Sequence, residues 1–359
     1  MKKTITLSFS LLAATSLAQQ YSLTDLGTLG GYTVTAGGIN ASGQIVGNSE
    51  VTSNHVAHGF VWSNGVMTDL GTFGGTKSVG HDINASGQIA GTANTANNAD
   101  YRACRWSGSE MQDLGALDVG ASQGLGINDS GQVVGLSYIA SSYSHAFLWS
   151  NAGMQDLKTL GGLNSYAVRI NSSGQVVGTS QTSTNSEHAV YWLNGVIHDL
   201  GTPNEGQGSH AADINDAGQI VGSSLRPILW ENGSMQDLGT LGGTGGWAYG
   251  INNSGLIVGS SYLLGDGLLR AFMWSGGVMR DLNSFLDSSR ADWTVYEATD
   301  INDNGWICAN ARDSNRVQHA VLLRPVPEPS SVIVITLGLA TKPFRRKLRR
   351  RRLEGSIAD

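Results

Sequence analysis

The sequence predicts an all-β fold, a seven-bladed β-propeller with four antiparallel strands per blade and a ring closed by the N-terminal strand. One observation behind this prediction is a repeat, because Ile-Asn before a glycine turn occurs seven times and Asp-Leu also occurs seven times. Most copies lie 43 or 44 residues apart, a period typical of solenoids and propellers. A second observation is that the two ends of the repeated region are incomplete in complementary ways. The repeat anchors are Ile39, Ile83, Ile127, Ile170, Ile214, Ile251 and Ile301, with Asp25, Asp69, Asp113, Asp156, Asp199, Asp237 and Asp281.

Each repeat holds four short runs that alternate in polarity and are rich in Val, Ile and aromatic residues. Asn, Ser and Gly separate the runs, as expected for turns between strands. No stretch of the repeated region shows convincing helical periodicity. Four strands per repeat are typical of a propeller blade. In the third repeat the runs are GLGIN (124–128), QVVGLS (132–137), HAFLW (145–149) and MQDL (154–157).

The ends of the repeated region predict how the ring closes. It begins with YSLTDLG (21–27), a fourth strand without the first three, and finishes with HAVLLRP (319–325), a third strand without a fourth. We expect Leu23–Leu26 to pair with Val321–Leu323 and complete the seventh blade. Such closure removes open sheet edges, whereas a solenoid would need capping units instead.

The motif INASGQIVG (39–47) is interpreted as a structural turn. Asn suits the first turn position, and Gly can adopt the left-handed conformation of a hairpin bulge. A catalytic loop would occur once, but this motif occurs seven times. The last copy, DINDNG (300–305), matches the start of a calcium loop, which leaves calcium binding as an alternative. Ala311 stands where that loop requires Glu, and no helices are expected beside it, so we expect no metal.

Every third strand starts with His or Arg, and every fourth strand carries an Asp. The two are expected on one face of a blade, diagonally opposed. His and Arg both donate hydrogen bonds to a carboxylate, which predicts a structural clasp in each blade. A catalytic dyad is the alternative, but it would need a nucleophile and one special copy. The clasp residues include the pairs His58 and Asp69, His145 and Asp156, and His188 and Asp199.

Charge and cysteine content limit the classes of partner. The repeated region carries 12 basic and 25 acidic residues, a formal charge of −13, which argues against nucleic acid. Cys104 and Cys308 replace apolar residues in the repeat, so we expect two buried free thiols. They belong to blades two and seven, which are not neighbours, and a disulfide needs Cα atoms within about 7 Å.

Loop lengths point to one face of the ring as the binding surface. The turns between first and second strands and between third and fourth strands are constant, whereas the other two connections vary. Successive connections alternate faces, so the variable loops share one face, where binding residues usually lie. The longest insertion, SFLDSSRADWTVYEA (284–298), adds six residues before the seventh Ile-Asn. Its candidate ligand-contacting residues are Asp287, Arg290, Asp292, Trp293, Tyr296 and Glu297; the alternative is a solvated loop.

The two termini flank the predicted propeller, which spans residues 19–324. Residues 1–18 carry two lysines, an apolar run and Ser16-Leu17-Ala18, a pattern typical of a signal peptide cut after Ala18. The tail, 325–359, contains Pro327-Glu328-Pro329, then 12 uncharged residues (330–341), then an Arg-rich end. As helix the uncharged run would extend roughly 18 Å, and a bilayer core is about 30 Å thick. We therefore expect only transient membrane contact through this tail.

HAFLW (145–149), HGFVW (58–62) and HAVYW (188–192), together with DLGTLGG and the Ile-Asn turns, resemble the HAF-type extracellular repeats. The tail resembles a PEP-CTERM sorting signal, with Pro327, Glu328 and Pro329 as its motif. The two resemblances imply an exported bacterial protein that an exosortase sorts to the cell envelope, the cell surface or an extracellular matrix. They imply no assigned chemistry.

We expect a non-enzymatic binding or scaffold propeller without cofactor or metal. Its partners would be the exosortase-type sorting enzyme and an exopolysaccharide or another surface protein. One alternative is an envelope hydrolase or lyase acting on polysaccharide or ester, with its site on the variable-loop face. Such an enzyme would need two carboxylates facing one cleft. A metal-dependent propeller is a further alternative, although no His/Asp cluster beyond the repeats supports it.

Overall fold

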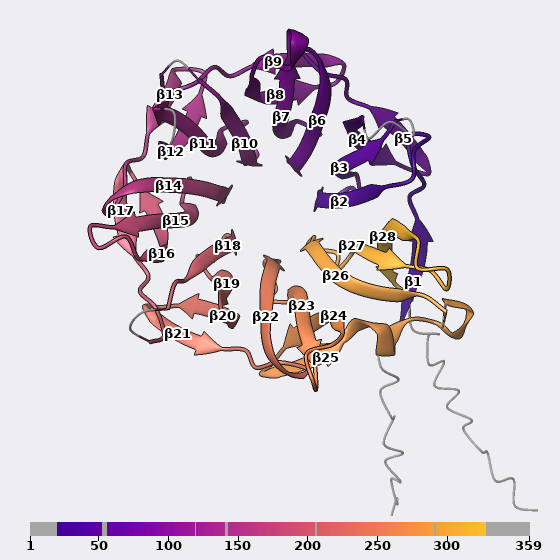
Figure 1. Cartoon of the computed structure of the whole chain (residues 1–359). Coiled ribbons are helices and arrows are strands. Elements are labelled where there is room, and N and C mark those ends of the chain that lie inside the picture. Colours follow the sequence, from indigo (N-terminus) through magenta and orange to yellow (C-terminus); the bar gives the residue numbers. More distant parts are fainter. Residues whose placement is uncertain are drawn as a thin grey trace, which may run out of the picture. The chain divides into compact units, whose positions relative to one another are not determined.

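The computed structural model describes residues 20–51, 56–118, 120–140, 143–204, 207–290 and 292–327. These residues form seven four-stranded antiparallel sheets arranged as a ring (Figure 1). The all-β, seven-bladed propeller expected from the sequence is therefore confirmed. The predicted signal peptide (1–18), Glu328, Pro329 and the rest of the tail lie outside the described residues.

In blades one to six, each sheet follows chain order from the inner to the outer strand (Figure 1). Blades one to three hold β2 (Val34–Ile39), β3 (Ile45–Glu50), β4 (Ala57–Ser63) and β5 (Val66–Asp69); β6 (Gly74–Ile83), β7 (Ile89–Thr95), β8 (Tyr101–Ser107) and β9 (Glu110–Asp113); β10 (Ser122–Ile127), β11 (Val133–Ala140), β12 (Tyr143–Ser150) and β13 (Gly153–Asp156). Blades four to six hold β14 (Gly161–Ile170), β15 (Val176–Thr182), β16 (Glu187–Leu193) and β17 (Val196–Asp199); β18 (His210–Ile214), β19 (Ile220–Ser224), β20 (Arg226–Glu231) and β21 (Ser234–Asp237); β22 (Gly242–Ile251), β23 (Ile257–Leu263), β24 (Leu269–Ser275) and β25 (Val278–Asp281). Short 3₁₀ turns occupy η1 (Ala96–Asn98), η2 (Leu282–Phe285) and η3 (Ser288–Arg290).

Blade seven joins the two ends of the described chain. It contains β26 (Thr294–Ile301), β27 (Ile307–Arg312) and β28 (Gln318–Pro325), with β1 (Tyr21–Asp25) as its outer strand. Leu23 pairs with Leu323 and Asp25 with Val321 in antiparallel register. The predicted closure by the N-terminal strand is therefore confirmed. It replaces two exposed strand edges with backbone hydrogen bonds.

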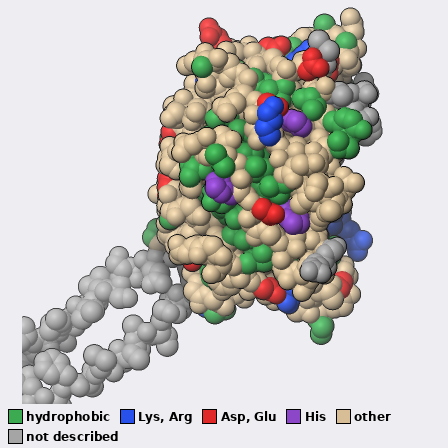
Figure 2. Space-filling model, turned by 90° about the vertical axis from the view of Figure 1, so that its left-hand side faces the viewer, with side chains coloured by type: hydrophobic (Ala, Val, Ile, Leu, Met, Phe, Trp, Pro, Cys, Tyr) green, Lys and Arg blue, Asp and Glu red, His purple; other side chains and the backbone are tan. Residues whose placement is uncertain are grey.

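The hydrophobic core is divided into clusters that lie between neighbouring blades. One cluster joins Val46 of blade one to Ile83, Cys104 and Trp106 of blade two. The indole Nε1 of Trp106 also donates to the carbonyl of Leu70 at 2.9 Å, which links the same two blades. On the rim, hydrophobic and histidine side chains reach the surface together (Figure 2). In blades one to six, the tryptophan of the third strand belongs to a cluster shared with the preceding blade of the ring.

The two cysteines are free and buried, as predicted. Cys104 belongs to the cluster between blades one and two, and Cys308 to the cluster between blades seven and one. Burial raises the pKa of both thiols well above the ordinary value, so neither forms thiolate readily. Both cysteines therefore act as small apolar residues.

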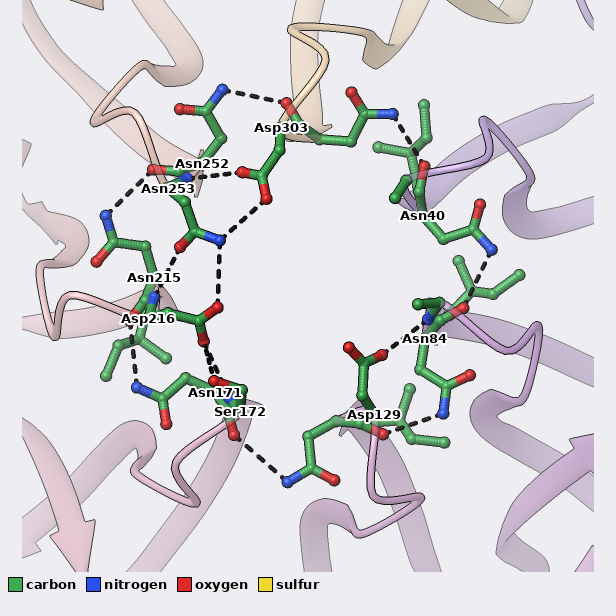
Figure 3. A pocket seen from close by; sticks show the side chains of 18 of the residues that line it. Asn40, Asn84, Asp129, Asn171, Ser172, Asn215, Asp216, Asn252, Asn253 and Asp303 are labelled. Carbon is green, nitrogen blue, oxygen red and sulfur yellow. Dashed lines mark hydrogen bonds between the residues drawn. The ribbon is translucent and has the colours of Figure 1, made fainter.

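A closed ring of side-chain hydrogen bonds runs around the inner edge of the propeller (Figure 3). In each blade the repeat asparagine donates through Nδ2 to the backbone carbonyl of the same asparagine in the next blade. The seven donor–acceptor distances range from 2.9 to 3.4 Å. Each amide thereby fixes the position of its neighbour. The ring consists of Asn40, Asn84, Asn128, Asn171, Asn215, Asn252 and Asn302.

The other end of the same asparagine side chain shapes its own turn. Oδ1 of Asn40 accepts the backbone N–H of Gln44 at 3.0 Å, and Gly43 adopts a left-handed φ of 79°. Five of the seven asparagines also donate to the Gln side chain four residues later. The motif INASGQIVG thus both closes a hairpin and joins two blades. This arrangement gives the motif a structural role in every blade.

We expect replacement of Asn171 by Asp to destabilise the whole propeller. The carboxylate keeps the acceptor for the turn but loses the donor that reaches Asn215, and it buries a charge. A lost buried hydrogen bond costs about 1–3 kcal/mol. Urea denaturation should show this loss in the free energy of unfolding, whereas the exposed turn substitution Asn232→Asp should change it by less than about 0.5 kcal/mol. Equal effects of the two variants would contradict a stabilising role for the ring.

Candidate functional site

The structure brings each of the three predicted His–Asp pairs together. Nδ1 of His58 lies 2.8 Å from a carboxylate oxygen of Asp69. The corresponding distances are 3.0 Å for His145 and Asp156 and 2.9 Å for His188 and Asp199. The same type of contact closes blade seven, where His319 lies 2.9 Å from Asp25 on β1.

Each aspartate of these pairs has a second structural task. Oδ1 of Asp69 accepts the backbone N–H of Gly71 at 2.7 Å, and Asp25, Asp156 and Asp199 accept from the residue two positions later in the same way. This Asx turn ends the outer strand and directs the chain into the next blade. The carboxylate is therefore shared between a turn and a clasp, an arrangement that suits architecture better than proton transfer.

Two blades with arginine in place of histidine differ from the expected clasp. In blade two Arg102 approaches Asp100 at 3.5 Å and donates to the carbonyl of Gly120. In blade six Arg270 lies at 4.0 Å from Asp281. In blade two the physical reason is reach, because the longer arginine side chain contacts Asp100 and the carbonyl of Gly120 instead of Asp113, whereas Arg226 of blade five keeps its contact with Asp237 at 2.7 Å. The structure therefore confines the tight clasp to the remaining blades.

The mouth of the central channel lies on the face with the constant turns. It is a depression of about 230 Å³, lined by the asparagine ring and the residues beside it. Three of these are acidic, Asp129, Asp216 and Asp303. Each carboxylate accepts a backbone N–H from the preceding blade, at 2.9 Å from Ala85 in the first case. Within the described ranges, no group of three or more His, Cys, Asp or Glu side chains could hold a metal ion, and Asp303 of DINDNG is bonded to Asn253 instead.

Deeper in the channel lies a charged layer that the sequence did not predict. Arg169 points between Asp82 and Asp213, with Nε at 3.9 and 3.8 Å from their carboxylates. Asp213 also bridges two blades, because it accepts the backbone N–H groups of Ile214 and Ile251 at 2.8 Å. Asp82 and Asp300 make the equivalent bridges to blades three and one. The sequence does carry a signal for this layer, because the residue before each repeat isoleucine is Gly, Asp or Arg.

Glycine at three of these positions makes room for the charged layer. A Cβ on Gly126 would lie 2.6 Å from the carbonyl oxygen of Val168 and 2.9 Å from Cα of Arg169. Both contacts are to backbone, which cannot move aside cheaply. The channel thus has space for charged side chains because, for each charged residue of this layer, at least one adjacent blade has glycine at the equivalent position.

Burial controls ionisation in the channel. It raises the pKa of Asp213 to about 7 and that of Asp300 to about 6, although the guanidinium of Arg169 lowers both. His81 is kept neutral because burial, and then Arg169, lower its pKa to about 4. A carboxyl group whose pKa is raised in the folded state stabilises that state below its unfolded pKa, near 4. This contribution is lost as the pH rises through 6 to 7.

We expect Arg169→Gln to destabilise the protein far more at pH 8 than at pH 5. Arg169 contacts both Asp82 and Asp213, and its removal leaves Asp213, whose pKa is about 7, to ionise without this counter-charge. Loss of one partner of a largely buried ion pair costs about 3–5 kcal/mol. Urea unfolding at the two pH values measures the difference. A pH-independent effect, or an equal effect of Arg280→Gln on the surface, would contradict this assignment.

The predicted binding residues of the blade-seven insertion do not form one cluster. Trp293 packs partly against the core of blade seven and tilts over His319 with ring centroids 4.7 Å apart. The guanidinium carbon of Arg290 lies 5.7 Å from the Trp293 ring. Asp287 accepts the backbone N–H of Ser289 at 2.7 Å and so shapes its own turn. Hydrogen bonding to the Ser289 side chain, and then to its backbone, lowers the pKa of Asp287. Asp292 is exposed.

The last two predicted residues point elsewhere. Glu297 accepts a hydrogen bond from Asn310 at 2.8 Å and lies beside Tyr249 of the neighbouring inner strand, where burial raises the pKa of the tyrosine to about 12. Tyr296 lies under the guanidinium of Arg312, whose carbon is 4.8 Å from the ring centroid. A bulge between Val295 and Glu297 separates these side chains. Tyr296 thus belongs to a different part of the surface from Trp293.

Exposed apolar side chains favour the face with the variable loops. Of ten exposed large hydrophobic residues in the described ranges, seven lie at strand ends or loops of this face. The other three, Val66, Val196 and Val278, follow the constant turns on the opposite side. The seven are Tyr32, Tyr143, Leu163, Leu225, Leu264, Leu268 and Val317.

Two clefts lie between neighbouring blades. One, of about 650 Å³, opens between blades four and five and is lined by Tyr191 and His198, whose rings stack at 4.5 Å. The other, of about 590 Å³, opens between blades six and seven on the variable-loop face and includes Tyr296.

The fold and its surface define a β-propeller built from one repeated blade. No protein-family profile and no curated protein sequence matches the chain. Among solved structures, a putative TolB from Agrobacterium tumefaciens is similar at 10% identity and a TM-score of 0.45, over 82% of this chain and 91% of that one. The β-propeller domain of the Trilobed protease from Pyrococcus furiosus is similar at 10% identity and a TM-score of 0.41, over 85% and 84%. At such values the propeller assignment rests on the strand pairing within this chain. None of the helices in the described part is long and apolar enough to cross a membrane.

Proposed function

We propose that this chain is an exported, non-catalytic propeller that binds or scaffolds material of a bacterial envelope or extracellular matrix through its variable-loop face. The observation that carries the proposal is the distribution of exposed hydrophobic residues, seven on that face and three on the other. Exposed apolar side chains contribute to interaction surfaces, and they are more frequent on the variable-loop face than on the other face. Loops of variable length on a rigid scaffold favour the same conclusion.

The engagement of the repeated ionisable groups supports binding over catalysis. The His–Asp pairs hold outer strands, and the channel aspartates hold inner strands, so both sets have structural work in every blade that carries them. In the insertion, Asp287 and Glu297 are each bonded to neighbouring protein groups. A hydrolase or lyase would need two carboxylates free to face one substrate.

The sorting part of the proposal rests on the tail sequence. β28 ends at Pro325, and Pro327-Glu328-Pro329 follows after one residue. An exosortase-type enzyme would therefore meet its motif directly beyond the closing strand. The predicted signal peptide at the other end provides the route across the inner membrane.

We expect charged substitutions on the variable-loop face to weaken binding to matrix material isolated from the producing bacterium. Leu264→Asp with Leu268→Asp should reduce the bound fraction at least tenfold in a sedimentation assay, because both side chains are exposed at that face. Val66→Asp with Val196→Asp is the matched control on the opposite face. Unfolding midpoints should stay unchanged in both variants. Loss of binding in the control alone would overturn the assignment of the face.

We also expect the mature protein to begin at Gln19 and to lack the segment after Pro327-Glu328-Pro329. Intact mass measurement of protein from the native envelope tests both ends at once. A variant with Ala at the three motif positions should retain the Arg-rich end. Finding residues 349–352 on most surface-exposed wild-type molecules would contradict sorting by an exosortase.

A further inference from the structure

We propose that the cleft between blades six and seven binds an acidic sugar unit, a saccharide that carries carboxylate or sulfate groups. This inference rests on the proposed function and names the class of ligand for the variable-loop face. The cleft encloses about 590 Å³, within the range of about 300–1,000 Å³ that is usual for small-molecule sites. Its wall combines arginines with tyrosines: Arg270, Arg312, Arg316, Tyr262, Tyr296 and Thr294 are among the lining residues.

Positive charge is concentrated in this cleft although the propeller is acidic. Three of the 12 basic residues of the repeated region line it, and Asp313 is the one acidic lining residue. Asp313 accepts the backbone N–H groups of Asn315 and Val317 at 2.9 and 2.8 Å, so its carboxylate is held by its own turn. In the described part of the chain, neither Arg312 nor Arg316 has a carboxylate within 4.0 Å. Two guanidinium groups are therefore available to an anion.

The backbone of Arg316 indicates that its side chain is there for a reason other than folding. Arg316 adopts a left-handed φ of 65° in the turn that follows β27. The matching turns of blades four and six place Asn185 and Asp266 at this point, with φ of 62° and 55°. In all three turns the residue donates its N–H to the carbonyl three positions earlier, at 2.9–3.0 Å. Asn and Asp tolerate this conformation better than Arg, and strained residues cluster at functional sites.

The aromatic wall favours a sugar over a simple anion. Arg312 lies over the ring of Tyr296 at 4.8 Å, and Tyr262 packs edge-on against Trp247 at 5.9 Å, so both tyrosines are held in place. Tyrosine presents an apolar ring face and a hydroxyl, which suit the C–H face and the hydroxyl groups of a sugar. Arginine forks match carboxylate and sulfate in geometry and charge. Together they fit a saccharide ring with an anionic substituent.

Titration calorimetry of the full-length protein tests the proposal with four probes: tetragalacturonate, a chondroitin sulfate tetrasaccharide, neutral maltotetraose and tetraglutamate. We expect the anionic saccharides to bind, with affinity falling as salt rises, and the other two to bind at least tenfold more weakly. Arg316→Asn should weaken binding at least tenfold without lowering the unfolding midpoint, because Asn185 fills the same position in blade four. Arg312→Gln, which copies Gln181 of blade four, is the second variant. Arg280→Gln is the control of equal charge on β25 of blade six.

Unchanged affinity in both cleft variants would overturn the site, and equal binding of tetraglutamate would overturn the preference for sugars. The two saccharide probes separate carboxylate from sulfate as the recognised group. Failure of both saccharides to bind, with matrix binding still dependent on Leu264 and Leu268, would reject the inference and leave the proposed function intact. Saccharide binding that requires Arg316, with matrix binding insensitive to changes on the variable-loop face, would support the saccharide site and reject the proposed function.

Discussion

The asparagine ring is the constraint on which the rest of this propeller depends. Each of the seven side chains shapes its own hairpin through Oδ1 and holds the next blade through Nδ2. A contact of about 3 Å therefore fixes the distance between neighbouring blades at the inner edge. Because these contacts form a closed ring, small deviations in blade spacing cannot add up from one blade to the next. Tryptophans and apolar side chains then need only fill the wedge-shaped space outside this edge.

Much of this architecture could be predicted from the sequence because it is repeated. Asp25 and His319, which lie 294 positions apart, were expected in one blade since each repeat places such a pair at a fixed spacing. The charged channel layer could not be predicted, because Asp82, Arg169 and Asp213 come from different blades and meet only in the closed ring. The spacing of residues in the sequence also does not reveal that the candidate binding residues of the blade-seven insertion lie in different surroundings. The bulge between Val295 and Glu297 turns successive side chains to different surroundings.

The variation between blades follows a physical rule. Where the repeat is conserved within the chain, the side chains meet their counterparts in adjacent blades, and a change in one would disturb two interfaces. At the loop ends, departures from the repeat such as Arg312 and Arg316 place side chains in solvent. One blade can therefore acquire new surface chemistry without affecting the ring. The excess of exposed apolar groups on the same face is consistent with this freedom.

The strand order of blade seven, β1-β28-β27-β26, has a mechanical consequence. The tail continues from β28, which is not an edge strand but lies between β1 and β27 and is hydrogen-bonded to both. Tension applied through the tail would load these antiparallel pairs along their length, so several hydrogen bonds would have to break together instead of one after another. A propeller attached through this end would resist being pulled open, and the outer strand contributed by the N-terminus would share the force.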